Sequence, residues 1–294
     1  MAFWGILSAL LSAGAWAFGT ITFEHIGKVV PYVGITFLKG VFSIVLMALL
    51  LLFTGGLYTS GWWVFTFFSF SGIIGITIGD SLFFKSLQDL GAKTQVIFFL
   101  LGQILTMLLS LLFLGELLSL KQYLGASILL IGVVTTTWGT QSNHPNKWRG
   151  IVYGLLSMLC FSISAIMVKA VIGDVPVITA TFYRMVFGTI FALGYGVASK
   201  NFKTWIASLK DKRLCGLFVL NVIVITYGGF LLSMAAIKFI SVALASVLSV
   251  TEPIFVLVLD FFISKEKITK RELFGTIVTL IGLFLIINSE RLIG

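Results

Sequence analysis

The chain has 294 residues, of which 59% are hydrophobic and 11% are charged, and its mean hydropathy is +1.10. A soluble domain carries about 25% charged residues, so this composition excludes an ordinary soluble protein and favours one embedded in lipid. The net charge of +9 does not indicate a nucleic-acid partner, because the Lys and Arg residues cluster in short loops between apolar runs, where they orient membrane spans.

Apolar runs close to 20 residues long recur along the sequence, and about 20 residues of helix cross the hydrocarbon of a bilayer. The chain begins in such a run without a basic segment before it, so we expect a retained span and not a cleaved signal peptide. We predict an all-α polytopic membrane protein with ten transmembrane helices. They are expected at about 3–23, 32–53, 62–84, 92–114, 121–140, 149–171, 177–198, 212–235, 242–263 and 271–289.

The second half of the chain is a faded copy of the first. The two copies align at an offset of 145 residues near their starts and of 150 residues further on. Matching pairs are Gly5 and Gly150, Phe37 and Phe182, Ile104 and Ile254, Glu116 and Glu266, and Gly125 and Gly275. Self-similarity at a nearly fixed offset indicates a duplicated unit, which we place at residues 1–143 and 149–294.

Each copy holds five of the ten expected spans. Because five is odd, the second copy enters the membrane from the opposite face, and the two repeats are inverted. Inverted repeats are typical of secondary transporters, whose substrate sites lie near the middle of the bilayer between the repeats. The loops after odd-numbered spans carry fourteen Lys and Arg residues and the other side carries four, so both termini are expected outside the cell.

Two basic residues fall inside expected spans, where an ionisable group is costly and is a functional hypothesis by default. Lys39 in the second span and Arg184 in the seventh are equivalent positions of the two repeats. Since these spans begin on opposite faces, we expect the cations on either side of the midplane, one toward each mouth of a cavity between the repeats. Both are candidate substrate-binding residues.

Two acids are candidate partners of these cations. Asp80 in the third span is expected near the depth of Lys39, either in a fixed ion pair that holds helices in register or in a transport site. Glu252 in the ninth span lies near the centre, next to Pro253, which is expected to kink that span. Glu252 is therefore either a ligand or proton site, or a structural hydrogen-bonding group at the kink.

Polar and aromatic residues of other spans are further candidates for the wall of the cavity. Trp16, Asn221 and Tyr227 are the ones we single out, with ordinary helix packing as the alternative. No metal or cofactor site is expected, because His25 and His144 have no ligand spacing around them.

With these residues in place, the chain resembles the EamA-type transporters of the drug/metabolite transporter superfamily. The resemblance covers nearly the whole chain and rests on two five-span halves, each closed by a hairpin with a Glu and a later Gly. The hairpins are Phe113-Leu114-Gly115-Glu116 through Gln122-Tyr123-Leu124-Gly125, and Lys265-Glu266 through Gly275. Thr251-Glu252-Pro253, Arg184 and Trp16 match the acid–proline element of span nine, a basic residue of span seven and an aromatic residue of span one.

The resemblance implies a secondary transporter, often an exporter, of small organic metabolites such as amino acids, acting by alternating access in a bacterial inner (plasma) membrane. Its partners would be a small-molecule substrate and the lipid bilayer, with proton coupling and oligomeric state left open. Two features depart from the family. Members usually have both termini in the cytoplasm, whereas the loop charges here favour the reverse, and Gln103 stands where a symmetric repeat would have the proline.

Two other functions stay open from the sequence. The first is export of cationic or lipophilic drugs, with Glu252 as the substrate and proton site and with Lys39 and Arg184 as structural residues. The second is a membrane scaffold that transports nothing. An enzyme is not expected, because the sequence has no paired carboxylates at catalytic spacing, no nucleophile motif and no phosphate-cradling glycine loop.

Overall fold

The computed structural model of the chain describes residues 2–54, 57–58, 61–137, 146–198, 200, 204–205, 211–263 and 269–290. These residues form helices and no strand. Eight helical segments within them are long and apolar enough to cross a membrane, and two shorter apolar helices cover Phe98–Leu114 and Leu120–Thr135. The all-helical membrane class is therefore confirmed, whereas the expected ten spans correspond to eight long segments and two short ones.

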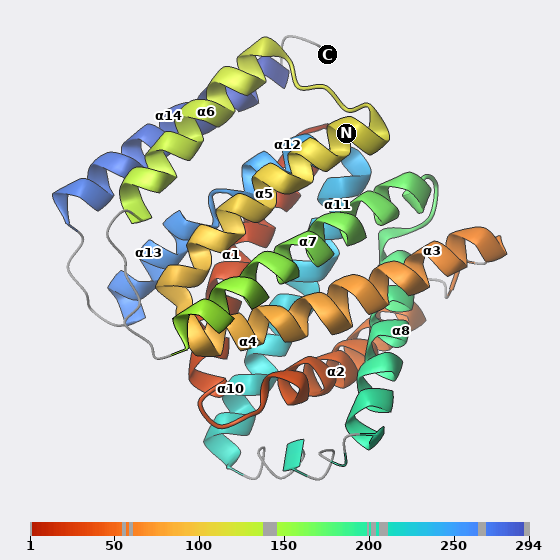
Figure 1. Ribbon diagram of the computed structural model, residues 1–294. Helices are drawn as coiled ribbons and strands as arrows, with labels where there is room; N and C mark the ends of the chain where they lie inside the picture. The colour runs from red at the N-terminus through yellow and green to blue at the C-terminus, as the bar shows by residue number, and fades with distance from the viewer. Residues whose placement is uncertain are drawn as a thin grey trace.

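The helices follow the expected order along the chain (Figure 1). The first half contains α1 (Ala2–Ile26), α2 (Tyr32–Phe53), α3 (Trp62–Gly72), η1 (Ile73–Gly79), α4 (Asp80–Leu90), α5 (Ala92–Leu114) and α6 (Leu120–Thr137). The second half contains α7 (Lys147–Ile172), α8 (Val177–Ala198), α10 (Lys212–Ile223), η3 (Val224–Leu231), α11 (Leu232–Phe239), α12 (Val242–Ser249), α13 (Glu252–Ile263) and α14 (Lys270–Glu290). The hairpin residues Lys265 and Glu266 lie outside the described residues.

Short caps and glycine turns separate the helices. Ser241 begins α12 by accepting a hydrogen bond from the backbone N–H of Leu244 at 3.1 Å, which satisfies one of the free donors at a helix start. Gly115 ends α5 with a φ of +66°, a left-handed conformation that glycine adopts without a Cβ penalty. These local signals place the ends of both helices within a residue or so of the expected limits.

The third and eighth spans each contain a π-helical segment, and the two segments are related by the repeat. η1 (Ile73–Gly79) and η3 (Val224–Leu231) nearly coincide when the first is shifted by 150 residues. A π-helical turn holds more residues than an α-helical turn and often marks a functional site. The two long helices, α3–η1–α4 and α10–η3–α11, also run further than expected, to Leu90 and Phe239.

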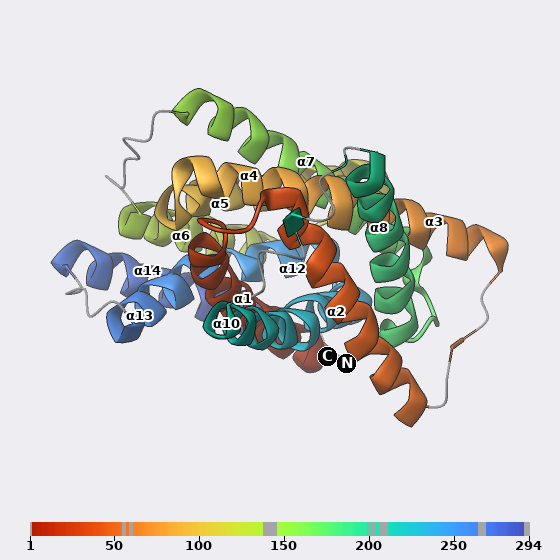
Figure 2. The ribbon, with the colours of Figure 1, turned by 90° about the horizontal axis from the view of Figure 1, so that it is seen from below.

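The two halves interlock through their first helices. α1 of the first half packs on η3 and α11 of the second, and α7 of the second half packs on η1 and α4 of the first. α2 packs beside α8, and α6 and α14 form a pair along one edge of the molecule, where they lie side by side in both views (Figures 1 and 2). The seam between the halves thus runs through the middle of the molecule.

Small residues let the helices approach closely at this seam. A Cβ on Gly75 in η1 would lie 2.5 Å from the hydroxyl of Ser164 in α7, and a Cβ on Gly72 would overlap the backbone of Arg184 in α8. Close packing of this kind drives helix association in lipid, where there is no hydrophobic effect between helices. The glycines therefore bring the third span against the two helices that carry Ser164 and Arg184.

The ninth span is broken near its centre. α12 ends at Ser249 and α13 begins at Glu252, and the two residues between them belong to neither helix. Pro253 follows directly, and its ring and missing N–H prevent a continuous helix through this point. The break therefore lies where the sequence predicts a kink, and it places Glu252 at the start of a half-helix.

Candidate functional site

A cavity of about 180 Å³ lies between the two halves. Its wall combines charged, hydroxyl-bearing and aromatic side chains from both repeats. The charged and polar lining residues are Thr20, Asp80, Gln103, Thr106, Ser164, Arg184, Ser233, Ser246, Ser249 and Glu252, and the aromatic ones are Trp16, Phe83, Phe99, Phe161 and Phe230. Such a mixture of apolar surface and a few polar groups is typical of small-molecule sites.

The cavity has two different ends. At one end its wall includes Ile237 and Val242, which flank the junction of α11 and α12. At the other end it stops at Thr20, Phe83 and Phe99. The wall of the cavity thus runs through the middle of the seam, from the residues near the α11–α12 junction to Thr20, Phe83 and Phe99.

Lys39 and Asp80 form an ion pair beneath the cavity wall. Lys39 is 0% exposed and Asp80 is 1% exposed. The ammonium group also lies 4.6 Å from the ring centroid of Phe230 and 5.3 Å from that of Phe84, within the range of cation–π attraction. Asp80 lines the cavity and Lys39 does not. Lys39 is therefore closed off behind Asp80, whereas the sequence predicted that it faces one mouth of the cavity.

Arg184, the repeat counterpart of Lys39, does line the cavity. Its Nη2 donates to the Ser164 hydroxyl at 2.9 Å and its Nη1 contacts the Met234 sulfur at 2.9 Å. Its Nε has no hydrogen-bond partner in the part of the chain that the structure describes. The guanidinium group is therefore fixed in position, with one buried donor left unpaired among the described residues.

Glu252 lies in the cavity wall at the start of α13 and is 3% exposed. Its Oε1 accepts a hydrogen bond from the Thr20 hydroxyl at 3.3 Å, whereas its Oε2 has no partner within the described ranges. A carboxylate at a helix N-terminus is favoured by the helix dipole. Gly102, at the repeat-equivalent position, also lines the cavity, so Glu252 has no carboxyl counterpart at the matching position of the first repeat.

Trp16 lines the cavity as expected, and its ring is held from two sides. Its indole N–H donates to the Ser233 hydroxyl at 3.4 Å, and the ring meets Phe230 edge-on with centroids 4.9 Å apart. The Ser12 hydroxyl lies 2.6 Å from that of Ser233 and donates to the backbone oxygen of Gly229. This network joins α1 of the first half to η3 and α11 of the second.

Tyr227 and Asn221 are not part of the described cavity wall. The Tyr227 hydroxyl donates to the backbone oxygen of Leu46 at 2.9 Å, which ties η3 to α2. Asn221 is 0% exposed, and its amide group has no hydrogen-bond partner among the described residues. The geometry therefore gives Tyr227 a structural contact and leaves Asn221 buried away from the cavity.

Several lining residues were not singled out from the sequence as candidate site residues. Gln103 and Thr106 on α5, Ser164 on α7 and Ser233 on α11 are polar residues inside apolar spans. Their polarity within an apolar span was the sequence signal that could have identified them as lining residues. It is a weak signal, because Ser and Thr also bond to their own helix backbone, as Thr106 does to the oxygen of Gly102 at 2.9 Å.

Comparison with known proteins agrees with this architecture. The sequence model of the EamA-like transporter family matches residues 3–138 and again residues 148–288. A solved crystal structure, described only as that of a protein, superposes with a TM-score of 0.71 at 17% sequence identity and covers 96% of this chain and 94% of its own. No match was found among curated proteins. The identity is low enough that the superposition speaks to the fold alone.

Proposed function

Because the chain belongs to the EamA-like transporter family, we propose that it transports a small organic metabolite such as an amino acid, in the direction of export. The family implies a membrane transporter of small molecules. The identity of the solute and the direction of transport are our proposal. The geometry of the cavity supports the identity of the solute.

The observation that carries the choice of solute is a pair of unused polar groups in one cavity. Arg184 and Glu252 both line the cavity, and each has one buried polar atom, Nε and Oε2, without a hydrogen-bond partner among the described residues. An amino acid carries a carboxylate that suits the first group and an ammonium group that suits the second. Charge-assisted hydrogen bonds of both kinds are about twice as strong as neutral ones.

The size of the cavity favours a metabolite over a large drug. Sites for drug-sized ligands have volumes of about 300–1,000 Å³, whereas this cavity measures about 180 Å³. The aromatic residues Phe83, Phe99 and Phe161 in its wall offer apolar contact to the remainder of the solute. A small zwitterion with an apolar side chain fits this combination.

We further propose that α5 and α6 are the fourth and fifth spans, which gives ten spans in two inverted repeats. The repeat-related segments η1 and η3 support this reading, as does the pairing of α6 with α14. In an inverted pair of repeats, each half passes through the conformations of the other as access alternates. We also propose that it resides in a bacterial inner (plasma) membrane, and the loop charges favour both termini outside.

The contrast between Lys39 and Arg184 supports alternating access. The two cations occupy equivalent positions, yet Lys39 is closed off with Asp80 while Arg184 borders the cavity. In the opposite-facing conformation the two environments would exchange, so that Lys39 meets the solute and Arg184 is closed off. Asp80, which pairs with Lys39 in this structure, would then change its partner during the cycle.

A second candidate is export of cationic or lipophilic drugs. It is favoured by the free Oε2 of Glu252 beside an aromatic wall. In that case Glu252 would bind the cation or carry a coupling proton, and Arg184 would be structural. The membrane scaffold has less support, because the family consists of transporters.

Counterflow in proteoliposomes tests the proposal. Purified protein is screened against amino acids, organic anions and organic cations, and the variants Lys39→Ala and Arg184→Ala are then compared on any solute that exchanges. Loss of exchange of a zwitterion in both variants supports the assigned roles. Unchanged exchange in both variants, or a preference for cations that depends on Glu252 alone, contradicts the amino-acid assignment.

A further inference from the structure

One end of the molecule is closed by an apolar layer. Beyond Thr20 and Phe83, where the cavity stops, the rings of Phe23 and Phe84 meet with centroids 4.7 Å apart, and Phe218 lies 6.4 Å from Phe23. These three rings belong to one buried cluster of side chains from both halves. We call the region beyond them the Asp89 end; it comprises the turn at residues 27–31, the end of α4 at residues 85–91 and the start of α7 at residues 147–150.

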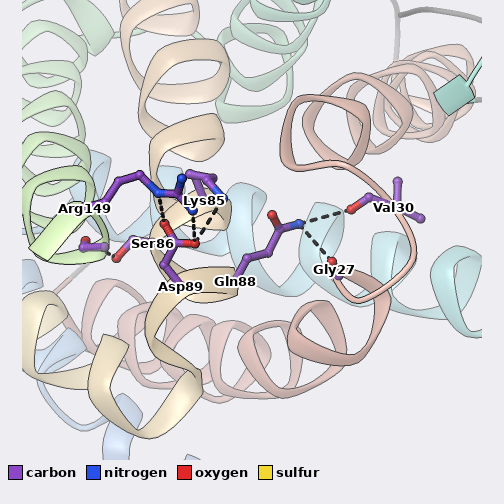
Figure 3. Close-up of polar contacts among 8 residues, drawn as sticks. Gly27, Val30, Lys85, Ser86, Gln88, Asp89 and Arg149 are labelled. Atoms are coloured by element: carbon purple, nitrogen blue, oxygen red, sulfur yellow. Dashed lines mark hydrogen bonds and ion pairs between the residues drawn. The ribbon is translucent and has the colours of Figure 1, made fainter. Parts of the chain in front are cut away.

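An ion pair joins the two halves at the Asp89 end (Figure 3). The Nε of Arg149 lies 2.8 Å from Oδ2 of Asp89, and its Nη2 donates to Oδ1 at 2.8 Å. Lys85 adds a third contact to Oδ1 at 3.0 Å. A guanidinium group that meets both carboxylate oxygens is the strongest and most specific form of ion pair. Since Asp89 is on α4 and Arg149 is on α7, the contact crosses the seam.

A second polar contact at this end lies within the first half. The Gln88 amide donates to the backbone oxygens of Gly27 at 3.0 Å and Val30 at 3.1 Å (Figure 3). Its repeat counterpart is Lys238, which donates to the backbone oxygen of Val175 at 2.9 Å, and Val175 is the counterpart of Val30. Both ends of the molecule therefore have this clamp, and it does not distinguish them.

The ion pair, in contrast, is specific to one end. The positions equivalent to Asp89 and Arg149 hold Phe239 and Trp4, which carry no charge. The helix packing itself is shared, because Gly150 lies against Asp89 and Leu90 just as Gly5 lies against Phe239 and Ile240. The Asp89–Arg149 ion pair is thus present at only one of two helix contacts that are otherwise packed alike.

The opposite end has only a weaker ionic contact across the seam in the described part of the chain. There, Lys169 on α7 lies 3.9 Å from Glu116, which follows α5. Glu116 also accepts from the backbone N–H of Ala243 at 3.2 Å. A single ionic contact near 4 Å contributes little to stability compared with a bidentate guanidinium–carboxylate pair.

We propose that Asp89 and Arg149 are positioning residues of the transport cycle: their pairing holds the Asp89 end closed while the cavity is reached from the opposite end, and it must separate before a solute can pass the Asp89 end. The proposal rests on the alternating access proposed above. It adds that an ionic contact helps the apolar layer described above to close the Asp89 end.

A distance measurement tests this without any solute. Lys28 and Lys147 are exposed and stand on opposite sides of the seam at the Asp89 end, so cysteines placed there can carry spin labels after Cys160 and Cys215 are replaced by serine. Pulsed electron paramagnetic resonance in lipid nanodiscs then gives the distribution of distances between the labels. Asp89→Asn and Arg149→Gln are each expected to raise the ratio of open to closed populations about tenfold.

The double variant shows whether Asp89 and Arg149 act as a pair or affect the conformation independently. Because the residues act on each other, Asp89→Asn with Arg149→Gln should open this end no further than either change alone. Glu116→Gln, which alters the ionic contact at the opposite end, is the matched control and should leave the distribution unchanged. Monodisperse elution of each variant shows that it folds.

The proposal is overturned if folded Asp89→Asn and Arg149→Gln give the same distances as the parent protein, or if Glu116→Gln opens the Asp89 end equally. Failure to find a transported solute would count against the proposed function and would leave this measurement unaffected, because the labels report the conformation of the empty protein.

Discussion

The two members of the Lys39–Asp80 pair should differ in what their removal costs. Lys39 is fully enclosed, with Asp80 and the rings of Phe84 and Phe230 around its ammonium group. Replacing Asp80 with leucine leaves that charge buried and unpaired, which costs about 3–5 kcal/mol in proteins. The two ring faces offset part of this, by about 1–2 kcal/mol.

Replacing Lys39 with methionine should cost less. Asp80 borders the cavity, so its carboxylate can gain water when Lys39 is removed. We expect a loss of about 1–2 kcal/mol, in the range for a polar group that loses one partner. The double variant with methionine and leucine should recover most of the stability, because an apolar pair of similar volume replaces a buried ion pair at little cost.

The assay is the free energy of unfolding in mixed micelles, measured for the parent, both single variants and the double variant. Circular dichroism can follow the unfolding, since the described chain is helical. The reasoning is refuted if Lys39→Met destabilises the protein more than Asp80→Leu. It is also refuted if the double variant is as unstable as the worse single variant.

Three further results are expected from transport assays. Arg184→Gln should lower counterflow of a zwitterionic solute about tenfold, since hydrogen bonds to charged groups contribute about 1.5–3 kcal/mol. Tyr227→Phe, which lies outside the described cavity wall, is the control and should leave counterflow unchanged. Equal losses in the two variants would contradict the assignment of the site. If Glu252 carries a coupling proton, Glu252→Gln should abolish uptake driven by a pH gradient and spare counterflow, and a variant that keeps the gradient-driven flux rules this out. Ser233→Ala frees the indole N–H of Trp16 and should raise KM several-fold with little change in kcat; a fall in kcat alone would count against a positioning role.

The limits of most helices were predictable because each depends on a local signal. Apolar length set the extent of α2 and α8, which match the expected spans residue for residue. Pro253 marked the break in the ninth span for the steric reason given above. The repeat offset, which places Lys39 opposite Arg184, required only the alignment of the chain with itself.

The π-helical segments had no such signal, and they explain part of what was missed. Tyr227 lies inside η3, where the extra residue per turn rotates the following side chains away from the faces that an α-helical period predicts. The Tyr227 side chain therefore reaches α2, at the Leu46 carbonyl, and does not reach the cavity.

The contrast between Lys39 and Arg184 could not be read from the sequence either. The two positions have similar sequence contexts but different neighbours, because the counterpart of Asp80 is Phe230. Only Lys39 therefore has this acid as a partner, and neither fact says which cation borders the cavity. In this conformation Asp80 pairs with Lys39 and the cavity opens beside Arg184. A repeat pattern therefore locates the two cations but does not say which of them faces the cavity.

Alternating access is tested most directly by labelling one cavity residue from both sides of the membrane. Ser246 lines the cavity and is 5% exposed, so Ser246→Cys, in a chain without Cys160 and Cys215, offers a single thiol for a membrane-impermeant maleimide in proteoliposomes of known orientation. We expect the thiol to react from either side, with the rate on each side lowered by a transported solute. Reaction from one side only, whatever the conditions, would contradict a cavity that the two repeats open in turn.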